Sequence, residues 1–572
     1  MNLQKSFFLL YRKFPLFRTS FYVFIIAAVL ITVSIITVKT KKIPAIHSID
    51  PQIGLPGDTM TIKGENFGMT RGSSYVEIGN NRITASGYIQ WTDNQIQLIL
   101  PSNIQDGLIF VVTSSGKSEP EFFANEHGIP VAVPPDTKTL LPTISSVTPA
   151  SGVCNGLLTI NGTNFGTIRG KGCVLFSANR EDAKNEASRL PQDIQGELDI
   201  QYIPANEQDF DYEYWSDNEI RVRIPDGAEG GVLVVKTEKG LSNVFKIDVK
   251  FPIGKKTYSD RKTYLIQLNA DIDSIDAKTD TNIMLKVPRP VKTAGQPMAE
   301  LTECKPEPSV YDFKNTIIHQ VELQKNSQQT KKLSFSQNFV ISVYSIKTNI
   351  NEKQVKPFSE KSRILYKMAT TPDKLIRSGD EDFTALAKSI VGNETNPYTQ
   401  ARLIYEYITK NYRLVNIPRK ADANPKDLIK RKSGDAYDFS IVFTTLLRAC
   451  KIPCLPVSGI LIDADKQSKP HWWTEFYIEN FGWIPVDVAL GIGLEYRAFK
   501  PIANTHDFYF GNLDSQHIAF SRGWNEVKQS LINSKVVYRP KSYALQSIWE
   551  ESSSGNINYS SLWNDPIVLG IY

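Results

Sequence analysis

An internal repeat is the feature of this sequence that most limits how the chain can fold. Residues 46–72 (IHSIDPQIGLPGDTMTIKGENFGMTRG) match residues 144–170 (ISSVTPASGVCNGLLTINGTNFGTIRG) at a constant offset of 98 positions. A second block, which begins at Trp91 and Trp215, matches at an offset of 124, so the second copy contains a 26-residue insertion around residues 178–205. Two copies of one unit predict two similar domains in tandem.

Short alternating runs predict that both copies, and the region after them, consist of β-strands. Residues 60–62 and 232–235 belong to such runs, which glycine, proline and asparagine separate from one another. This is the pattern of small β-sandwiches. Alternation with a period of two continues through residues 264–268 and 339–343, so we expect a further β-sandwich over 251–355.

The two copies resemble the IPT/TIG family of immunoglobulin-like domains. Each contains a G-x-N-F-G turn, at 64–68 and 162–166, and a later W-(T/S)-D-N segment. The resemblance covers residues 43–125 and 142–250, and it implies surface display, spacing or protein binding without catalysis. Glycines in such turns are explained by their tolerance of positive φ, so no binding residue is assigned to them.

The N-terminus combines an uninterrupted apolar run with all of the chain's surplus positive charge. Residues 21–38 (FYVFIIAAVLITVSIITV) contain no charged side chain, and as a helix they would extend about 27 Å, close to the hydrocarbon thickness of a bilayer. Residues 1–42 contain seven basic residues and no acid, so the net charge of +5 leaves −2 for the other residues. We therefore predict a short basic segment at 1–20 and a transmembrane signal anchor at 21–38.

The anchor predicts a single-pass membrane protein whose larger, C-terminal part lies outside the cytoplasm, in the periplasm or at the cell surface. Basic residues flank the span on both sides, so the positive-inside rule gives only weak support for this orientation. A cleaved signal peptide would have a shorter apolar run and a small-residue cleavage site. Because the remaining chain is slightly acidic, it lacks the basic surface that nucleic-acid binding requires. The membrane is a predicted partner and nucleic acid is not.

Cysteine and histidine usage gives no indication of a metal site or a cofactor. The chain has five cysteines without a C-x-x-C motif, and its six histidines are scattered, so neither a metal nor a cofactor is predicted. Cys154 and Cys173 lie nineteen positions apart in the second repeat. They are either a disulfide or two small core residues, and the sequence leaves both readings open.

Helical patterns begin after the β-rich part. Asn396 followed by proline is typical of a helix start. Between Phe439 and Cys450, apolar residues recur at i, i+3, i+4, i+7, i+8 and i+11. This spacing predicts a helix that buries one stripe, with Asp435 at its start.

A predicted hairpin follows this helix. His471 and Trp473 are two positions apart, so they point to the same side of a predicted strand. A turn near residues 480–482 leads into the next strand. Because paired strands of a hairpin lie side by side, we expect Asp487 to come close to His471.

The order of these features resembles the core of the transglutaminase-like, papain-related superfamily. That pattern has G-x-C at the start of a helix, then L-L-R-A-x-x-I-P, a histidine followed by tryptophan and an acid, and G-W-x-x-V-D. The chain matches it with SGDAYDFS (433–440), LLRACKIP (446–453), HWWTE (471–475) and GWIPVD (482–487). The resemblance covers about 380–530 and implies an α+β domain there, which leaves 531–572 as a C-terminal extension.

The resemblance fails at the nucleophile. The family's catalytic cysteine corresponds to Ala436, whereas its histidine and acid correspond to His471 and Asp487, so the resemblance implies a catalytic set without its thiol. Candidate residues of the former groove are Asp435, Tyr437, Trp472 and Trp473. Each also has a structural explanation, because tryptophans commonly fill cores and an acid complements a helix N-terminus. Cys450 lies 14 residues along the helix, about 21 Å away, and cannot substitute.

Three functions remain open. The one we favour, because of Ala436, is a membrane-anchored, extracytoplasmic, mainly β protein with an immunoglobulin-like part and a transglutaminase-like pseudoenzyme domain. It would bind or scaffold a protein, peptide or cell-wall ligand at the cell envelope. The alternative is an active hydrolase or acyl transferase that uses His471 and Asp487 with a non-cysteine nucleophile or an activated water. An intracellular enzyme tethered by its N-terminal helix is the third.

Overall fold

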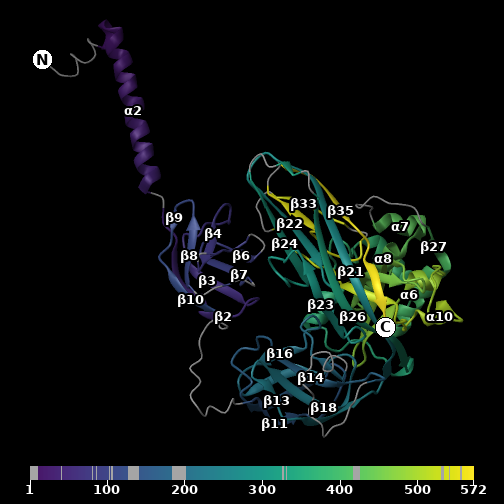
Figure 1. Cartoon of the computed structure of the whole chain (residues 1–572). Coiled ribbons are helices and arrows are strands. Elements are labelled where there is room, and N and C mark those ends of the chain that lie inside the picture. Colours follow the sequence, from purple (N-terminus) through teal and green to yellow (C-terminus); the bar gives the residue numbers. More distant parts are fainter. Residues whose placement is uncertain are drawn as a thin grey trace. The chain divides into compact units, whose positions relative to one another are not determined.

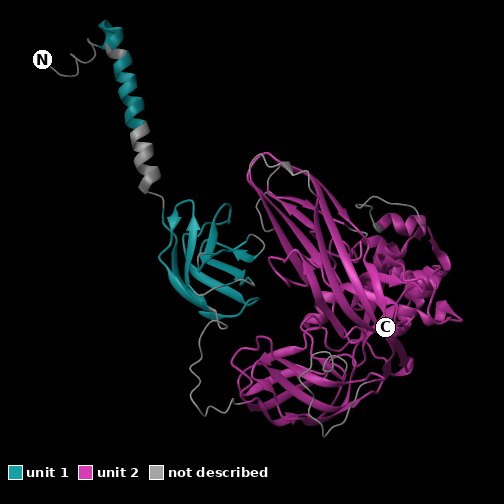
Figure 2. Cartoon of the chain, in the orientation of Figure 1, with its two compact units in different colours: residues 1–130, 530–532 teal, residues 131–529, 533–572 magenta. Residues whose placement is uncertain are grey.

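The structure is a computed structural model, and Figure 1 shows the whole chain. It describes residues 11–39, 42–79, 81–84, 87–101, 104, 107–125, 141–182, 201–324, 328–329, 332–415, 425–527, 529, 534–539, 542–553 and 557–572. The chain forms two compact units, residues 1–130 with 530–532 and residues 131–529 with 533–572 (Figure 2). It is a multidomain and mainly β architecture, as the sequence predicts.

Helix α2 (Pro15–Lys39) contains the predicted membrane span 21–38. The side chains of residues 30–38, and all of residues 1–10, lie outside the described part of the chain. Among the described residues, no helix is both long and apolar enough to cross a membrane. The transmembrane helix therefore stays a prediction.

The first repeat is a sandwich of two sheets around one core that includes Phe67 and Ile96. One sheet has the order β1 (Ala45–Asp50), β3 (Thr59–Glu65), β7 (Gln95–Ile99), β6 (Tyr88–Trp91). The other has the order β2 (Ile53–Gly54), β10 (Glu121–Asn125), β8 (Gly107–Thr113), β4 (Tyr75–Ile78), β5 (Asn81–Arg82), with β9 (Gly116–Lys117) paired to β8.

The second repeat has the same two sheets. The first has the order β11 (Thr143–Thr148), β13 (Leu157–Thr163), β17 (Glu219–Arg223), β16 (Tyr212–Trp215). The second has the order β12 (Ser151–Val153), β20 (Phe245–Lys250), β18 (Ala228–Thr237), β14 (Cys173–Ala178), β15 (Tyr202–Pro204), with β19 (Gly240–Leu241) paired to β18. Most of the predicted insertion, residues 183–200, lies outside the described residues. Cys154 and Cys173 are free thiols.

The shared sequence motif has the same structural role in both repeats. Asn66 and Asn164 have φ of 62° and 64°, so each turn needs a residue that tolerates the left-handed region. The indole Nε1 of Trp91 donates to the carbonyl of the turn phenylalanine at 3.1 Å, and that of Trp215 does the same at 3.2 Å. The motif therefore ties a turn to a distant strand, which is a structural function.

A middle sandwich follows, and it includes the end of the chain. One sheet has the order β23 (Met298–Lys305), β26 (Leu333–Ile350), β21 (Gly254–Ala277), β25 (Gln328–Gln329), with β35 (Ile557–Trp563) and β36 (Ile567–Ile571) paired to β21. The other has the order β24 (Thr316–Leu323), β22 (Thr281–Pro288), β34 (Glu550–Ser552), β33 (Lys535–Val537). Figure 1 shows the yellow β35 beside the teal β21. The predicted extension 531–572 thus supplies strands to the sandwich predicted over 251–355.

The remaining domain is α+β. Its antiparallel sheet has the order β31 (Gly482–Val486), β30 (Ser468–Ile478), β29 (Cys454–Ile462), β32 (His517–Arg522). Its helices are α4 (Ile364–Thr370), α5 (Glu381–Val391), α6 (Pro397–Asn411), α7 (Pro425–Arg431), α8 (Ala436–Ala449), α9 (Val488–Ile492) and α10 (Thr505–Phe508), with the short η3 (Glu352–Gln354) and the pair β27 (Arg413–Leu414) and β28 (Ser433–Gly434). The stripe predicted on α8 is buried against β30, with Phe439 and Phe476 in one core.

Candidate functional site

The N-terminus of α8 contains the position that the family resemblance assigns to a nucleophile. Asp435 caps the helix: its carboxylate accepts the Asp438 amide at 3.1 Å, and the Asp438 carboxylate accepts the Asp435 amide at 3.1 Å. This reciprocal pair is a capping box. Ala436 is the first helical residue and is buried. Both acids therefore serve to start the helix.

Strand β30 lies beside the first turn of α8. The ring of Tyr437 packs edge-on against Trp472, with the ring centroids 5.7 Å apart. Because successive side chains of a strand point to opposite faces, His471 and Trp473 lie on the other face from Trp472. The indole Nε1 atoms of both tryptophans are buried and have no hydrogen-bond partner within the described part of the chain. Two donors are thus unused at this end of the strand.

His471 and Asp487 make the contact that the predicted hairpin requires. Nε2 of His471 lies 2.5 Å from Oδ2 of Asp487, and both side chains are buried. Asp487 also caps α9, because its Oδ1 accepts the Leu490 amide at 2.9 Å. Since one oxygen is held by the helix start, the other keeps a fixed direction toward the imidazole.

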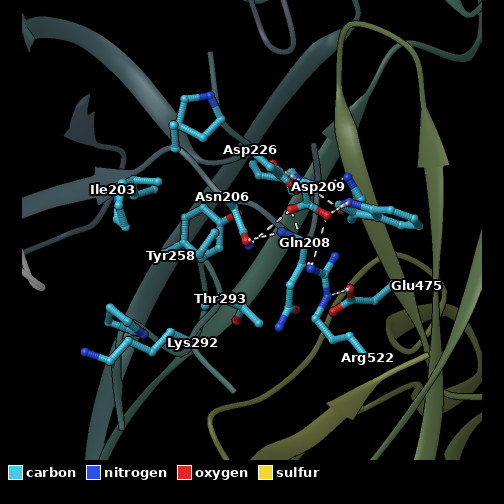
Figure 3. A pocket seen from close by; sticks show the side chains of 18 of the residues that line it. Ile203, Asn206, Gln208, Asp209, Asp226, Tyr258, Lys292, Thr293, Glu475 and Arg522 are labelled. Carbon is cyan, nitrogen blue, oxygen red and sulfur yellow. Dashed lines mark hydrogen bonds and ion pairs between the residues drawn. The ribbon is translucent and has the colours of Figure 1, made fainter. Parts of the chain in front are cut away.

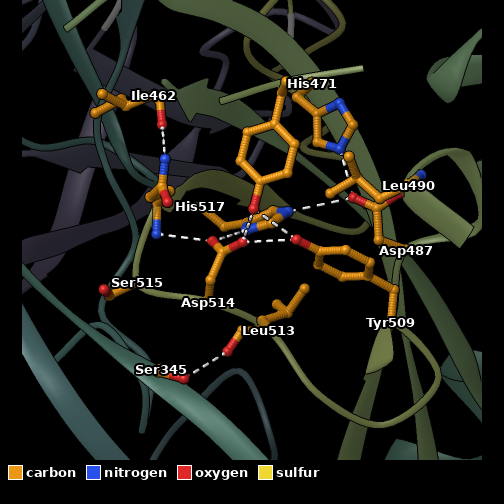
Figure 4. Close-up of polar contacts among 12 residues, drawn as sticks. Ser345, Ile462, His471, Asp487, Leu490, Tyr509, Leu513, Asp514, Ser515 and His517 are labelled. Atoms are coloured by element: carbon orange, nitrogen blue, oxygen red, sulfur yellow. Dashed lines mark hydrogen bonds and ion pairs between the residues drawn. The ribbon is translucent and has the colours of Figure 1, made fainter. Parts of the chain in front are cut away.

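A second histidine, which the sequence analysis did not single out, extends this network (Figure 4). His517 begins β32; its Nε2 lies 3.2 Å from Oδ2 of Asp487, and its Nδ1 lies 2.8 Å from Oδ1 of Asp514. The hydroxyl of Tyr509 donates to Oδ2 of Asp514 at 2.7 Å, and the hydroxyl of Tyr496 donates to the same oxygen. Each carboxylate therefore has several donors around it.

This network holds a buried positive charge between two negative ones. Burial by itself lowers the pKa of His517, but the carboxylates of Asp514 and Asp487 outweigh it and raise that pKa to about 9. Burial also disfavours the charged form of Asp487, yet the two histidines hold its pKa below the usual value. At neutral pH, His517 is therefore an imidazolium that donates both of its N–H groups, and Asp487 is a carboxylate.

Comparison with protein families assigns three regions of the chain. Residues 384–488 match the transglutaminase-like superfamily, and residues 44–124 and 142–253 match the IPT/TIG domain. The chain contains two IPT/TIG domains and a transglutaminase-like domain. Both resemblances identified from the sequence are confirmed, with the IPT/TIG domains before the transglutaminase-like domain.

Similarity to individual proteins covers shorter parts. A stretch of 80 residues is 38% identical to a cyclomaltodextrin glucanotransferase of Paenibacillus macerans and covers 14% of this chain and 11% of that enzyme. An uncharacterized Haemophilus influenzae protein is 27% identical over an alignment of 161 residues, and the match covers 23% of this chain and 44% of that protein. The chain thus spans about a tenth of the first relative and less than half of the second. A solved structure described as a candidate cysteine protease of Cytophaga hutchinsonii has 14% identity and a TM-score of 0.34, over 54% of this chain and 93% of that one.

Three residues of the transglutaminase-like domain could also hold a metal ion. One ligand atom each from His471, Asp487 and His517 lies within 4.8 Å of the others. Imidazole nitrogens bind a metal through their lone pairs, so an ion would have to replace the protons that Nε2 of both histidines shares with Asp487. The hydrogen bonds account for the cluster without such an exchange.

Other thiols of the chain are neither placed nor activated to act as the nucleophile. Cys450 follows the last residue of α8 and Cys454 begins β29, and burial raises their pKa to about 11 and about 12. In the middle sandwich, Sγ of Cys304 lies 3.7 Å from Nε2 of His319. Burial raises the pKa of this thiol to about 11 and lowers that of the histidine to about 4. Both groups are neutral, so no reactive thiolate–imidazolium pair forms.

One local feature of the sequence indicates that His517 could belong to a polar network. Asp514 and His517 are three residues apart, a spacing at which a carboxylate and an imidazole can meet in a turn. Their link to His471 depends on strand order, because β29 pairs with β30 on one side and with β32 on the other. That order is not readable from a local pattern.

Proposed function

We propose that this chain is a non-catalytic binding protein of the cell envelope, whose transglutaminase-like domain holds a ligand where its family has a catalytic groove. The observation that carries the proposal is Ala436 at the start of α8, in a domain that retains the hydrogen-bonded pair of His471 and Asp487. A methyl group has no lone pair with which to attack a carbonyl. The covalent step of cysteine chemistry therefore has no nucleophile.

Unused donors beside His471 support a binding role. The buried Nε1 atoms of Trp472 and Trp473 have no partner in the described part of the chain. A ligand oxygen that accepts from one of them would recover a hydrogen bond that burial otherwise removes. Peptide carbonyls and the hydroxyls of wall glycans both supply such oxygens. The relatives named cyclomaltodextrin glucanotransferases add carbohydrate to the ligand classes worth testing.

We also propose that the N-terminal helix anchors the protein in a membrane and that the IPT/TIG and transglutaminase-like domains lie on the extracytoplasmic side. This proposal is supported by the apolar run 21–38. It is also supported by the seven basic residues and the absence of acids in residues 1–42.

An active hydrolase is the second candidate, and the His471–Asp487 hydrogen bond of 2.5 Å favours it. An imidazole held by a carboxylate can act as a general base toward water or a hydroxyl. Turnover by this route would survive alkylation of every thiol and would stop in His471→Ala.

The experiment that tests the proposal restores the missing thiol with Ala436→Cys. The helix N-terminus would lower the pKa of that thiol below its usual value of about 8.5, and a hydrogen bond to the imidazole of His471 would add to that effect. We expect iodoacetamide to alkylate it at neutral pH faster than Cys450 or Cys454, and to do so more slowly after His471→Ala in the same background. Lys430→Cys, an exposed thiol in the last turn of α7, is the matched control for accessibility.

Two further outcomes decide between the candidates. The unmodified protein should show no turnover with thiol- or serine-directed activity probes. Turnover that alkylation abolishes would overturn the non-catalytic proposal. A pH profile of Ala436→Cys alkylation identical to that of Lys430→Cys would mean that the groove no longer assembles, and would contradict a ligand site there.

A further inference from the structure

A cavity of about 350 Å³ lies where the second IPT/TIG domain meets the middle sandwich and the transglutaminase-like domain (Figure 3). Neither His471 nor Asp487 lines it, so it is separate from the site described above. Its volume falls at the lower end of the range of about 300–1,000 Å³ that small-molecule sites occupy, and such sites are frequent at domain junctions.

One edge of the cavity consists of residues by which the second IPT/TIG domain differs from the first. Four residues separate Ile83 from Tyr88 in the first domain, whereas six separate the equivalent Ala205 from Tyr212 in the second. The longer connection, residues 206–211, supplies four consecutive residues to the cavity lining. The second repeat therefore differs from the first at a place where it meets the other domains.

Polar contacts across the junction fix the shape of the cavity. The guanidinium of Arg522 donates to Asp209 of the longer connection at 3.3 Å and to Glu475 of β30 at 2.8 Å. The indole Nε1 of Trp483 donates to Asp209 at 3.0 Å, and its amide donates to Asp226 at 2.9 Å. Because these groups are largely buried, their bonds are shielded from water. The cavity is thus pre-formed.

The charged side chains that line the cavity already have polar partners. Besides the Arg522 cluster, the pairs are Arg169 with Glu207, Lys256 with Asp226, and Lys292 with Glu300. Arg180 donates to the carbonyl of Ala294 at 3.0 Å. A charged ligand would have to break one of these contacts and leave a partly buried charge without compensation. The cavity therefore favours a ligand without net charge.

The cavity lining combines polar groups with an apolar surface. In Figure 3, Gln208, Asp209 and Arg522 lie on one side, and Ile203 and Tyr258 lie on the other together with Lys292 and Thr293. The polar side offers carboxylate acceptors, guanidinium donors, and an amide that both donates and accepts. The opposite side offers an aromatic ring and an aliphatic chain beside the polar groups of Lys292 and Thr293. A matching ligand has hydroxyl groups at its edge and C–H groups on its face.

We propose that this cavity binds a neutral saccharide of one or two rings. Its hydroxyl groups can donate to Asp209 and Glu475 and accept from Gln208 without adding charge, while a ring face packs against Tyr258. A free peptide of this size carries charged termini, which the paired lining disfavours. This inference goes beyond the proposed function, because it holds whether or not the groove near His471 binds or catalyses anything.

The test measures ligand binding by saturation-transfer NMR, with the full-length protein in a detergent without a sugar headgroup. The probes are maltose, cellobiose and diacetylchitobiose, with N-acetyl-triglycine amide as a neutral peptide. We expect at least one saccharide to bind at millimolar concentration. Gln208→Trp, which places an indole in the cavity, should weaken that binding at least tenfold. Gln354→Trp is the matched control, since Gln354 is an exposed glutamine of the same unit outside the cavity.

Each outcome decides the proposal. Loss of saccharide binding in Gln208→Trp and its retention in Gln354→Trp would support it. Absence of saccharide binding, binding of the peptide alone, or a saccharide signal that Gln208→Trp leaves unchanged would overturn it. A saccharide lost in His471→Ala but kept in Gln208→Trp would assign the sugar to the groove, which supports the proposed function and contradicts the cavity.

Discussion

Asp487 is the residue that joins the parts of the candidate site. Its two oxygens accept from His471, from His517 and from the Leu490 amide. A fully buried carboxylate is costly unless charge and hydrogen bonds compensate it. His517 supplies that charge from a strand that carries none of the family's catalytic residues. The ionised state of Asp487 is therefore maintained by both histidines, one of which lies outside the pair that the family resemblance assigns.

His517 makes the stability of the protein depend on pH. Its pKa is raised to about 9 in the folded protein, against about 6.5 when unfolded. Its contribution, on the order of 3 kcal/mol, is therefore fully present below about pH 6.5 and is lost as the pH rises through about 9. We expect calorimetry to show the unfolding temperature of the larger unit falling over this range.

The matched variants for this prediction are His517→Asn and His47→Asn. The first should flatten the loss of stability above about pH 6.5, because the group that titrates is gone. The second replaces an exposed histidine of the other unit and should leave the profile as it is. An equally steep profile in His517→Asn would show that other groups cause the pH dependence.

At the scale of the element, the start of α8 depends on its capping box. Asp435→Ala should destabilise the first turn by about 1 kcal/mol, while Asp435→Asn should cost only a few tenths because asparagine caps equally well. Hydrogen exchange by mass spectrometry should show roughly fivefold faster exchange of the first-turn amides in the alanine variant. Equal exchange in both variants would mean that Asp435 acts mainly through its charge.

Local pattern predicted most of the elements that form the candidate site. The apolar spacing of 439–450 gave α8, and Asn396 caps α6 by accepting the amides of Tyr398 and Thr399. The two offsets of the repeat predicted two equivalent sandwiches, whose sheets have the same strand order. These features succeed because hydrophobic period and cap chemistry are short-range properties.

What the sequence did not predict depends on pairing between distant strands. The sequence predicts residues 531–572 to be an extension, because an alternating run identifies a strand but not its neighbour. The same limit concealed His517, whose partner Asp487 belongs to another strand end, and the junction cavity, whose walls come from three domains. Contacts between residues far apart in the sequence produce no periodic pattern from which they could be predicted.

For the whole molecule, the anchoring proposal predicts a definite topology. A reporter fused after Tyr572 should be active only on the extracytoplasmic side, because residues 21–38 would hold the basic N-terminus in the cytoplasm. Deletion of residues 1–42 should release the protein from membranes. Lys63→Ala, a change of one exposed basic residue outside the segment, should leave fractionation unchanged. A cytoplasmic reporter signal would contradict the proposed location while leaving the domain assignment intact.

The return of the last strands to the middle sandwich has a consequence during synthesis. Strand β21 pairs with β35 and β36, and β22 pairs with β34. These partner strands are synthesised only after the transglutaminase-like domain, which lies between them in the sequence. Because domains fold as the chain emerges, synthesis must have passed β36 before this sandwich can close. A prematurely terminated chain would expose the open edge of β21 and the unpaired face of its partner sheet. Quality-control proteases would distinguish such truncated chains by these unpaired edges.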